Sequence, residues 1–187
     1  MPTQTAPQTA RPSTRVGLSP DELVVHTWGT DRTPRYAARV PGLNVLVGET
    51  LALVGDGTRE VLDALADALE DCAMLDGAVA AAAGTVRIHA VQAARVGMRA
   101  LAITDPFTRA GAGSHDLALA DLAGVADLGL TTVVAVTDVG VAALFADRVV
   151  VVRGGHPQVA YPVLAPTPRI PAEVAPVTDR VTARLAR

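Results

Sequence analysis

One stretch constrains the fold more than any other, residues 44–69 with the sequence NVLVGETLALVGDGTREVLDALADAL. Leu51–Val54 is an apolar run of the length of a buried parallel strand, and Gly55–Gly57 interrupts it. The apolar residues that follow fall at helical spacing, so one helix face can pack back onto the sheet: Val61, Leu62, Leu65, Ala66 and Leu69. The stretch therefore predicts a strand, a glycine turn and a helix, an arrangement that binds phosphate in many proteins.

The composition favours a parallel sheet covered by helices. Half of the 187 residues are hydrophobic but only 3% are aromatic, so Val, Leu and Ala must build the core. Two more apolar runs, Ala100–Ile103 and Thr132–Val136, are expected beside Leu51–Val54 in one mainly parallel sheet. Their carboxyl ends should then meet at one edge, which would bring together Gly55–Gly57, Thr104–Asp105 and Thr137–Asp138.

The chain divides into three expected parts. Residues 1–19 are rich in Pro, Thr, Gln and Ala and should be a disordered tail, residues 20–160 should form the α/β core, and residues 161–187 should be a Pro-rich tail with a short C-terminal helix. Within the first part of the core, Glu22–His26 reads as a short strand. Thr85–Val91 alternates like an edge strand, but a short helix fits it as well.

Charge and composition exclude several function classes. A net charge of -3 and an isoelectric point near 5.7 give the chain no overall basic field, so binding to nucleic acid is disfavoured. No apolar run is long enough to span a bilayer, no signal core begins the chain, and Cys72 has no disulfide partner, so we expect a cytoplasmic protein. The four histidines are scattered without zinc-ligand spacing, and no metal site is predicted.

Roughly residues 23–187 resemble the ATP-binding subunits of ABC transporters, most strongly in the two segments 48–69 and 100–155. The first contains the phrase GETLALVGDGTREVLDALAD, and the second contains Thr104–Phe107 (TDPF) and Ala146–Arg148 (ADR) followed by a valine-rich strand. The sequences of these motifs most resemble those of the nitrate, sulfonate and taurine importer ATPases. The resemblance implies a three-layer α/β fold with the P-loop NTPase core of an ABC ATPase, its helical subdomain reduced or missing because no signature motif lies between the two segments.

The same resemblance implies a set of site residues. Gly55, Asp56, Gly57, Thr58, Arg59 and Glu60 stand in the nucleotide-binding turn, Thr104, Thr137 and Asp138 stand at the ends of the two later strands, and Asp105 stands at the place of the catalytic glutamate.

The reactive residues of the family are nevertheless replaced. The turn is about three residues short, and Thr58, Arg59 and Glu60 stand where the family has Lys, Ser and Thr. Thr104 replaces the magnesium-binding Asp, and Asp138 replaces the switch histidine. We therefore expect a non-catalytic pseudo-ATPase with degenerate motifs. It would require no cofactor and would bind a protein partner, either a membrane permease, an ABC ATPase subunit or a second copy of itself.

Three alternatives stay open. The chain could bind ATP weakly with little or no hydrolysis, with Arg59 supplying the charge of the missing lysine. It could be a stand-alone α/β domain, unrelated to transport, that binds another anion at the Gly55 turn. An ordinary strand and helix without any ligand explains the same residues equally well.

Overall fold

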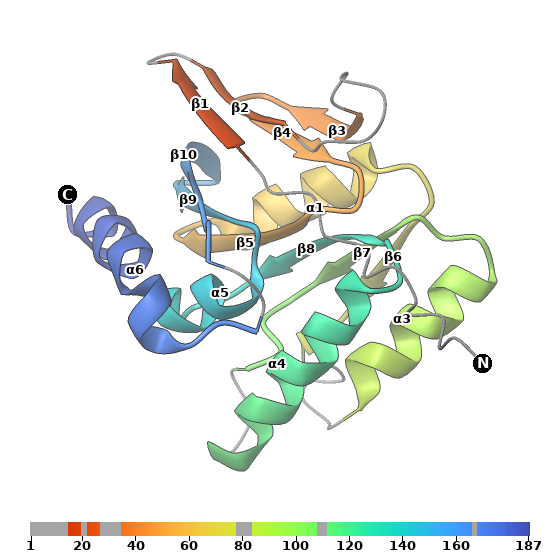
Figure 1. The fold of residues 1–187 in the computed structure, drawn as a ribbon. Coiled ribbons are helices and arrows are strands. Elements are labelled where there is room, and N and C mark those ends of the chain that lie inside the picture. The colour runs from red at the N-terminus through yellow and green to blue at the C-terminus, as the bar shows by residue number, and fades with distance from the viewer. Residues whose placement is uncertain (1–14, 20–21, 27–34, 78–83, 108–111, 166–167) are drawn as a thin grey trace, which may run out of the picture. The chain divides into compact units, whose positions relative to one another are not determined.

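The computed structural model describes residues 15–19, 22–26, 35–77, 84–107, 112–165 and 168–187 (Figure 1). Its contacts divide the chain into two units, Met1–Pro34 and Arg35–Arg187. In the first unit the described residues form an antiparallel hairpin of β1 (Arg15–Ser19) and β2 (Glu22–His26). β1 lies within the predicted tail, whose residues 1–14 are outside the described part, and the predicted domain limits remain predictions.

The second unit is built around a six-stranded sheet in the order β10-β9-β5-β8-β7-β6, in which β10 alone runs antiparallel to its neighbour. In chain order the elements of this unit are β3 (Tyr36–Val40), β4 (Leu43–Leu46), β5 (Thr50–Gly55), α1 (Thr58–Ala68), β6 (Cys72–Leu75), α3 (Thr85–Arg95), β7 (Ala100–Ile103), α4 (Ala112–Ala126), β8 (Thr131–Ala135), α5 (Val139–Phe145), β9 (Arg148–Arg153), β10 (His156–Pro162) and α6 (Pro171–Leu185).

Three layers make up this unit, as the sequence predicts. The hairpin β3–β4 and helix α1 share one apolar core with one face of the sheet, where Val45 and Leu62 pack with Leu51. Helices α3, α4, α5 and α6 share the other core, on the opposite face (Figure 1). Because both faces are covered, Leu51–Val54 is fully buried along its whole length.

The three predicted strands share this sheet. β5 pairs with β8, and β8 pairs with β7, in both cases in parallel, so the fold class predicted from the apolar runs is confirmed. The ambiguous segment from Thr85 is helical and forms α3. Val86, Ala90 and Ala93 are its buried residues, a helical spacing, whereas Ile88, which would share a strand face with Val86, is 58% exposed.

Between β6 and β7, α3 is the only helix of eight or more residues in the described part of the chain, which omits residues 78–83. No helix among the described residues combines the length and the apolar character needed to cross a bilayer.

Candidate functional site

The glycine turn between β5 and α1 packs against the chain's own backbone. Gly57 precedes α1 with a φ of 77°, and no side chain caps the helix there. A Cβ atom on Gly57 would lie 2.2 Å from the backbone nitrogen of Gly155, in the turn between β9 and β10. The Gly155 N–H donates a hydrogen bond of 3.4 Å to the carbonyl of Asp56. The β9–β10 turn therefore occupies the space directly beside the residues expected to surround a phosphate.

The Arg59 side chain forms an ion pair within its own helix. Its Nε lies 3.0 Å from an oxygen of Asp63, one helical turn further along α1, and both side chains are at least half exposed. Thr58 begins α1, and Glu60 lies exposed in its first turn. The chain contains no lysine at all, because arginine accounts for all 16 of its Lys and Arg residues. The charge that Arg59 would supply in the alternative of weak ATP binding is engaged in a surface ion pair with Asp63.

Asp105 ties the ends of β7 and β8 together. Its Oδ1 accepts a hydrogen bond of 2.9 Å from the Phe107 N–H. Its Oδ2 accepts two from Thr137, one of 3.0 Å from the backbone N–H and one of 2.8 Å from the hydroxyl. A carboxylate offers about four acceptor positions, so three of them are already used by the protein. About one acceptor position of Asp105 is left for a further donor.

Thr104 extends this linkage to the end of β6. Its Oγ1 accepts a hydrogen bond of 2.5 Å from the Gly77 N–H. A Cβ atom on Gly77 would lie 2.2 Å from the carbonyl oxygen of Asp105, so only glycine allows this close approach. The ends of the three neighbouring strands β6, β7 and β8 are consequently joined by hydrogen bonds, from Gly77 to Thr104 and from Thr137 to Asp105.

Asp138, which the sequence resemblance aligns with the switch histidine, has a local structural role. Its Oδ1 accepts a hydrogen bond of 3.1 Å from the Val141 N–H and so caps the short helix α5. The strand order places Asp138, Asp105 and the glycine turn at the same edge of the sheet, since β5, β7 and β8 are parallel. Their assignment to a ligand remains a prediction. Among the described residues no three His, Cys, Asp or Glu side chains cluster as candidate metal ligands.

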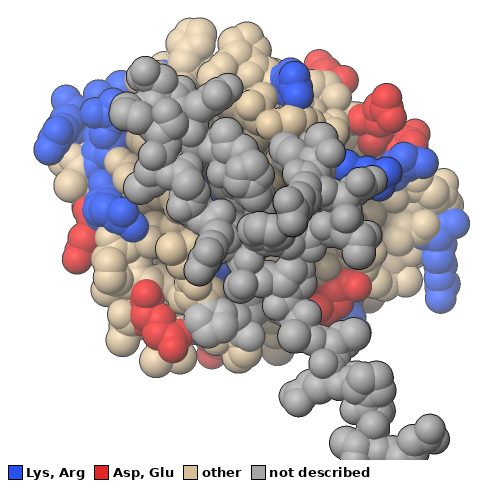
Figure 2. Space-filling model, turned by 45° about the horizontal axis from the view of Figure 1, so that its top comes forward, with Lys and Arg blue, Asp and Glu red and all other residues tan. Residues whose placement is uncertain are grey.

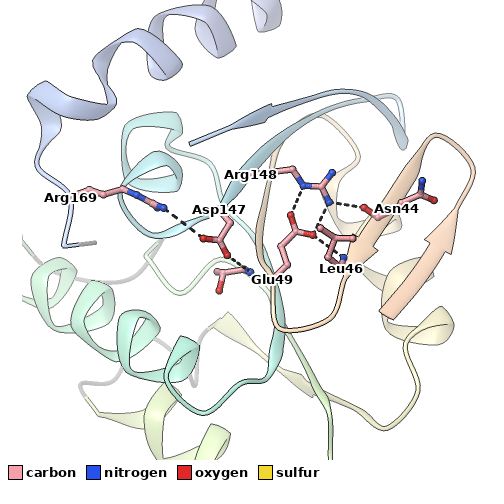
Figure 3. Close-up of polar contacts among 7 residues, drawn as sticks. Asn44, Leu46, Glu49, Asp147, Arg148 and Arg169 are labelled. Atoms are coloured by element: carbon pink, nitrogen blue, oxygen red, sulfur yellow. Dashed lines mark hydrogen bonds and ion pairs between the residues drawn. The ribbon is translucent and has the colours of Figure 1, made fainter. Parts of the chain in front are cut away.

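A buried polar cluster that was not identified from the sequence lies at the amino-terminal ends of β5 and β9 (Figure 3). Arg148, at the start of β9, forms a buried ion pair with Glu49, just before β5. Its Nε and one terminal amino group both donate to the Glu49 carboxylate, and that amino group also donates to the Asn44 carbonyl at 2.6 Å. Glu49 in addition accepts a hydrogen bond of 2.9 Å from the Leu46 N–H. The pair therefore joins the β3–β4 hairpin to the sheet.

Burial sets the electrostatics of this cluster. It raises the pKa of the Glu49 carboxyl above its ordinary value, whereas the hydrogen bonds and charge of Arg148 act in the opposite direction. The sequence signal for this pair was a charged residue beside each of two apolar runs, Glu49 before one and Arg148 before the other. The signal does not show that the two residues are partners, because they are 99 residues apart in the sequence.

A second charged group continues the cluster towards α6 (Figure 3). The Oδ2 of Asp147 accepts a hydrogen bond of 2.9 Å from the Thr50 N–H, and its Oδ1 lies 3.7 Å from Arg169. Arg169 also donates to the carbonyls of Ala146, at 2.6 Å, and Ala165, at 2.9 Å. Burial lowers the pKa of Arg169, and the charge of Asp147 counteracts this. These contacts anchor the segment before α6 to the start of β9.

Comparison with solved structures identifies proteins of similar fold. The chain is similar to cbiO1 from Clostridium perfringens, a part of the ABC transporter complex cbiONQ, with a TM-score of 0.51 and 12% identity over 76% of this chain and 84% of that one. It is also similar to the ATP-binding cassette MJ0796 in a dimeric post-hydrolysis state bound to ADP and Pi, with a TM-score of 0.48 and 12% identity over 82% of this chain and 97% of that one.

At such low identity, the likeness to cbiO1 shows a common fold and not a common activity. No family model matches the sequence, and no curated protein sequence matches it. The ABC-ATPase-like α/β fold is therefore established by the structure, and the function must be argued from the residues at the edge of the sheet.

Proposed function

We propose that this chain is a non-catalytic domain with the fold of an ABC-transporter ATP-binding subunit, and that it acts by binding a protein partner. The observation that carries the proposal is the engagement of Asp105, which the sequence resemblance aligns with the catalytic glutamate, by three hydrogen bonds from Phe107 and Thr137. Through these hydrogen bonds the Asp105 carboxylate holds the ends of β7 and β8 together. The fold would be kept as a scaffold while the chemistry of the family is lost.

The surroundings of the glycine turn support the same proposal. Phosphoryl transfer needs magnesium and a cationic side chain to neutralise charge, together with an oriented nucleophile. The chain has no lysine, Arg59 is paired with Asp63, and the Gly155 backbone packs against Gly57. The partner would be a membrane permease, an ABC ATPase subunit or a second copy of this chain, and the location would be cytoplasmic.

A calorimetric titration with ATP and magnesium tests the proposal. We expect no saturable heat at millimolar nucleotide, and no change when magnesium is omitted. The competing function, weak ATP binding at the glycine turn, predicts saturable heat that an Arg59→Gln variant reduces. Arg95→Gln serves as the control. Arg95 is an exposed arginine in the last turn of α3, so this substitution removes the same charge at a different place. Magnesium-dependent binding that is lost in Arg59→Gln and kept in Arg95→Gln would contradict the proposal.

A further inference from the structure

A groove with a volume of about 530 Å³ runs between β10 and α6. Val159 and Tyr161 of β10 line one side, and Arg180 and Arg184 of α6 line the other, with Arg187 just beyond the helix. The groove therefore combines an apolar and aromatic wall with a row of cationic side chains.

The positive charge of this groove is not compensated by the described residues. None of the ion pairs among them includes Arg180, Arg184 or Arg187. The guanidinium of Arg180 lies 5.8 Å from the centre of the Tyr161 ring, and its Nε donates to the Pro176 carbonyl at 3.1 Å, so the side chain is held over the groove. Figure 2 shows basic side chains gathered at its left margin, the side on which Figure 1 places α6. A chain with a net charge of -3 thus concentrates positive charge at this surface.

The spacing of the arginines indicates the shape of the ligand. Arg180 and Arg184 are one helical turn apart, so their Cα atoms are separated by about 6 Å along the axis of α6, and Arg187 follows just beyond the end of the helix. Alternate side chains of an extended peptide lie on one face at intervals of about 7 Å. Carboxylates at alternate positions of a peptide therefore match the row, whereas a single phosphate is too small to reach from one end to the other.

We propose that this groove binds an extended acidic segment of a partner protein. Alternate carboxylates of the segment pair with Arg180 and Arg184, and the residues between them contact Val159 and Tyr161. The inference rests on the proposed function in so far as that function requires a partner. Its test does not involve the glycine turn, so the two proposals can fail separately.

Fluorescence anisotropy with a labelled peptide tests the inference on the full chain. The probe is a seven-residue peptide in which Glu alternates with Val, and the control peptide has Gln in place of each Glu. We expect saturable binding of the Glu peptide that weakens as salt is added, and at least about tenfold weaker binding of the Gln peptide. Equal affinity for the two peptides, or no binding of the Glu peptide, would overturn the inference.

Matched variants locate the binding. The double variant Arg180→Gln/Arg184→Gln should weaken binding of the Glu peptide by about tenfold, since it removes two charge-assisted contacts. The control Arg95→Gln/Arg99→Gln makes the same change in net charge beside β7, far along the sheet from β10, and should change affinity by less than about twofold. Equal losses in the two double variants would overturn the inference, and so would displacement of the peptide by millimolar inorganic phosphate, which would indicate a small-anion site.

Discussion

An Arg148→Met variant is expected to lose about 3–5 kcal/mol of unfolding free energy, because it leaves the Glu49 carboxylate buried without its partner. Arg148 also satisfies the Asn44 carbonyl, which would lose its donor in the variant. Urea denaturation followed by circular dichroism would measure the loss. Arg99→Met, which removes an exposed arginine, is the control and should change stability by less than about 0.5 kcal/mol.

The loss in Arg148→Met should depend on pH with a definite sign. Burial raises the pKa of Glu49, and the lowering contributions of Arg148 are absent in the variant, so the pKa in the folded variant rises further. The folded state then binds a proton more tightly than the unfolded state. Stability is retained below the ordinary pKa of glutamate and is lost as the pH rises towards the raised value. Arg148→Met should therefore be closer to the wild type at pH 5 than at pH 8, and an equal deficit at both would contradict this assignment.

Asp105→Ala is expected to lower the free energy of unfolding by about 2 kcal/mol, because it leaves the Phe107 and Thr137 N–H groups without their acceptor. Asp105→Asn keeps one acceptor oxygen and should lose about half as much. Asp67→Ala, at an exposed carboxylate of α1, is the matched control and should stay within about 0.5 kcal/mol of the wild type.

The direction of the Asp105 effect distinguishes a structural from a catalytic role. Residues maintained for chemistry often reduce stability, so their replacement tends to be neutral or stabilising. Asp105→Ala with wild-type or higher stability would show that the carboxylate does not hold β7 and β8 together. It would also remove the main support for a non-catalytic domain.

Much of the fold could be predicted from the sequence because β5, β7 and β8 are covered on both faces. Each such strand is a continuous apolar run, and such a run followed by helical sequence has few alternatives to a parallel sheet. The secondary structure of Thr85–Val91 was ambiguous because its short apolar pattern fits both a strand and a helix. In the structure this segment is helical and packs against α4.

The contacts of the site residues could not be predicted from the sequence. The phrase at Thr104–Phe107 identified Asp105 and its place at a strand end, but not its hydrogen bonds to Thr137, which is 32 residues further along the chain. The Glu49–Arg148 pair depends on a contact over 99 residues. Local patterns carry no information on such partners, and only the register of β5 with β9 brings them together.

The most direct test of a non-catalytic role is steady-state release of phosphate from ATP in the presence of magnesium. Loss of one electrostatic stabiliser commonly costs about a hundredfold to a thousandfold in rate, and the resemblance to ABC ATPases implies that three such groups, the lysine, the magnesium-binding Asp and the switch histidine, are replaced here. We expect the wild-type protein at millimolar ATP and magnesium to release no more phosphate than a blank without protein. Release above the blank that Asp105→Asn abolishes and Asp67→Asn retains would contradict this expectation.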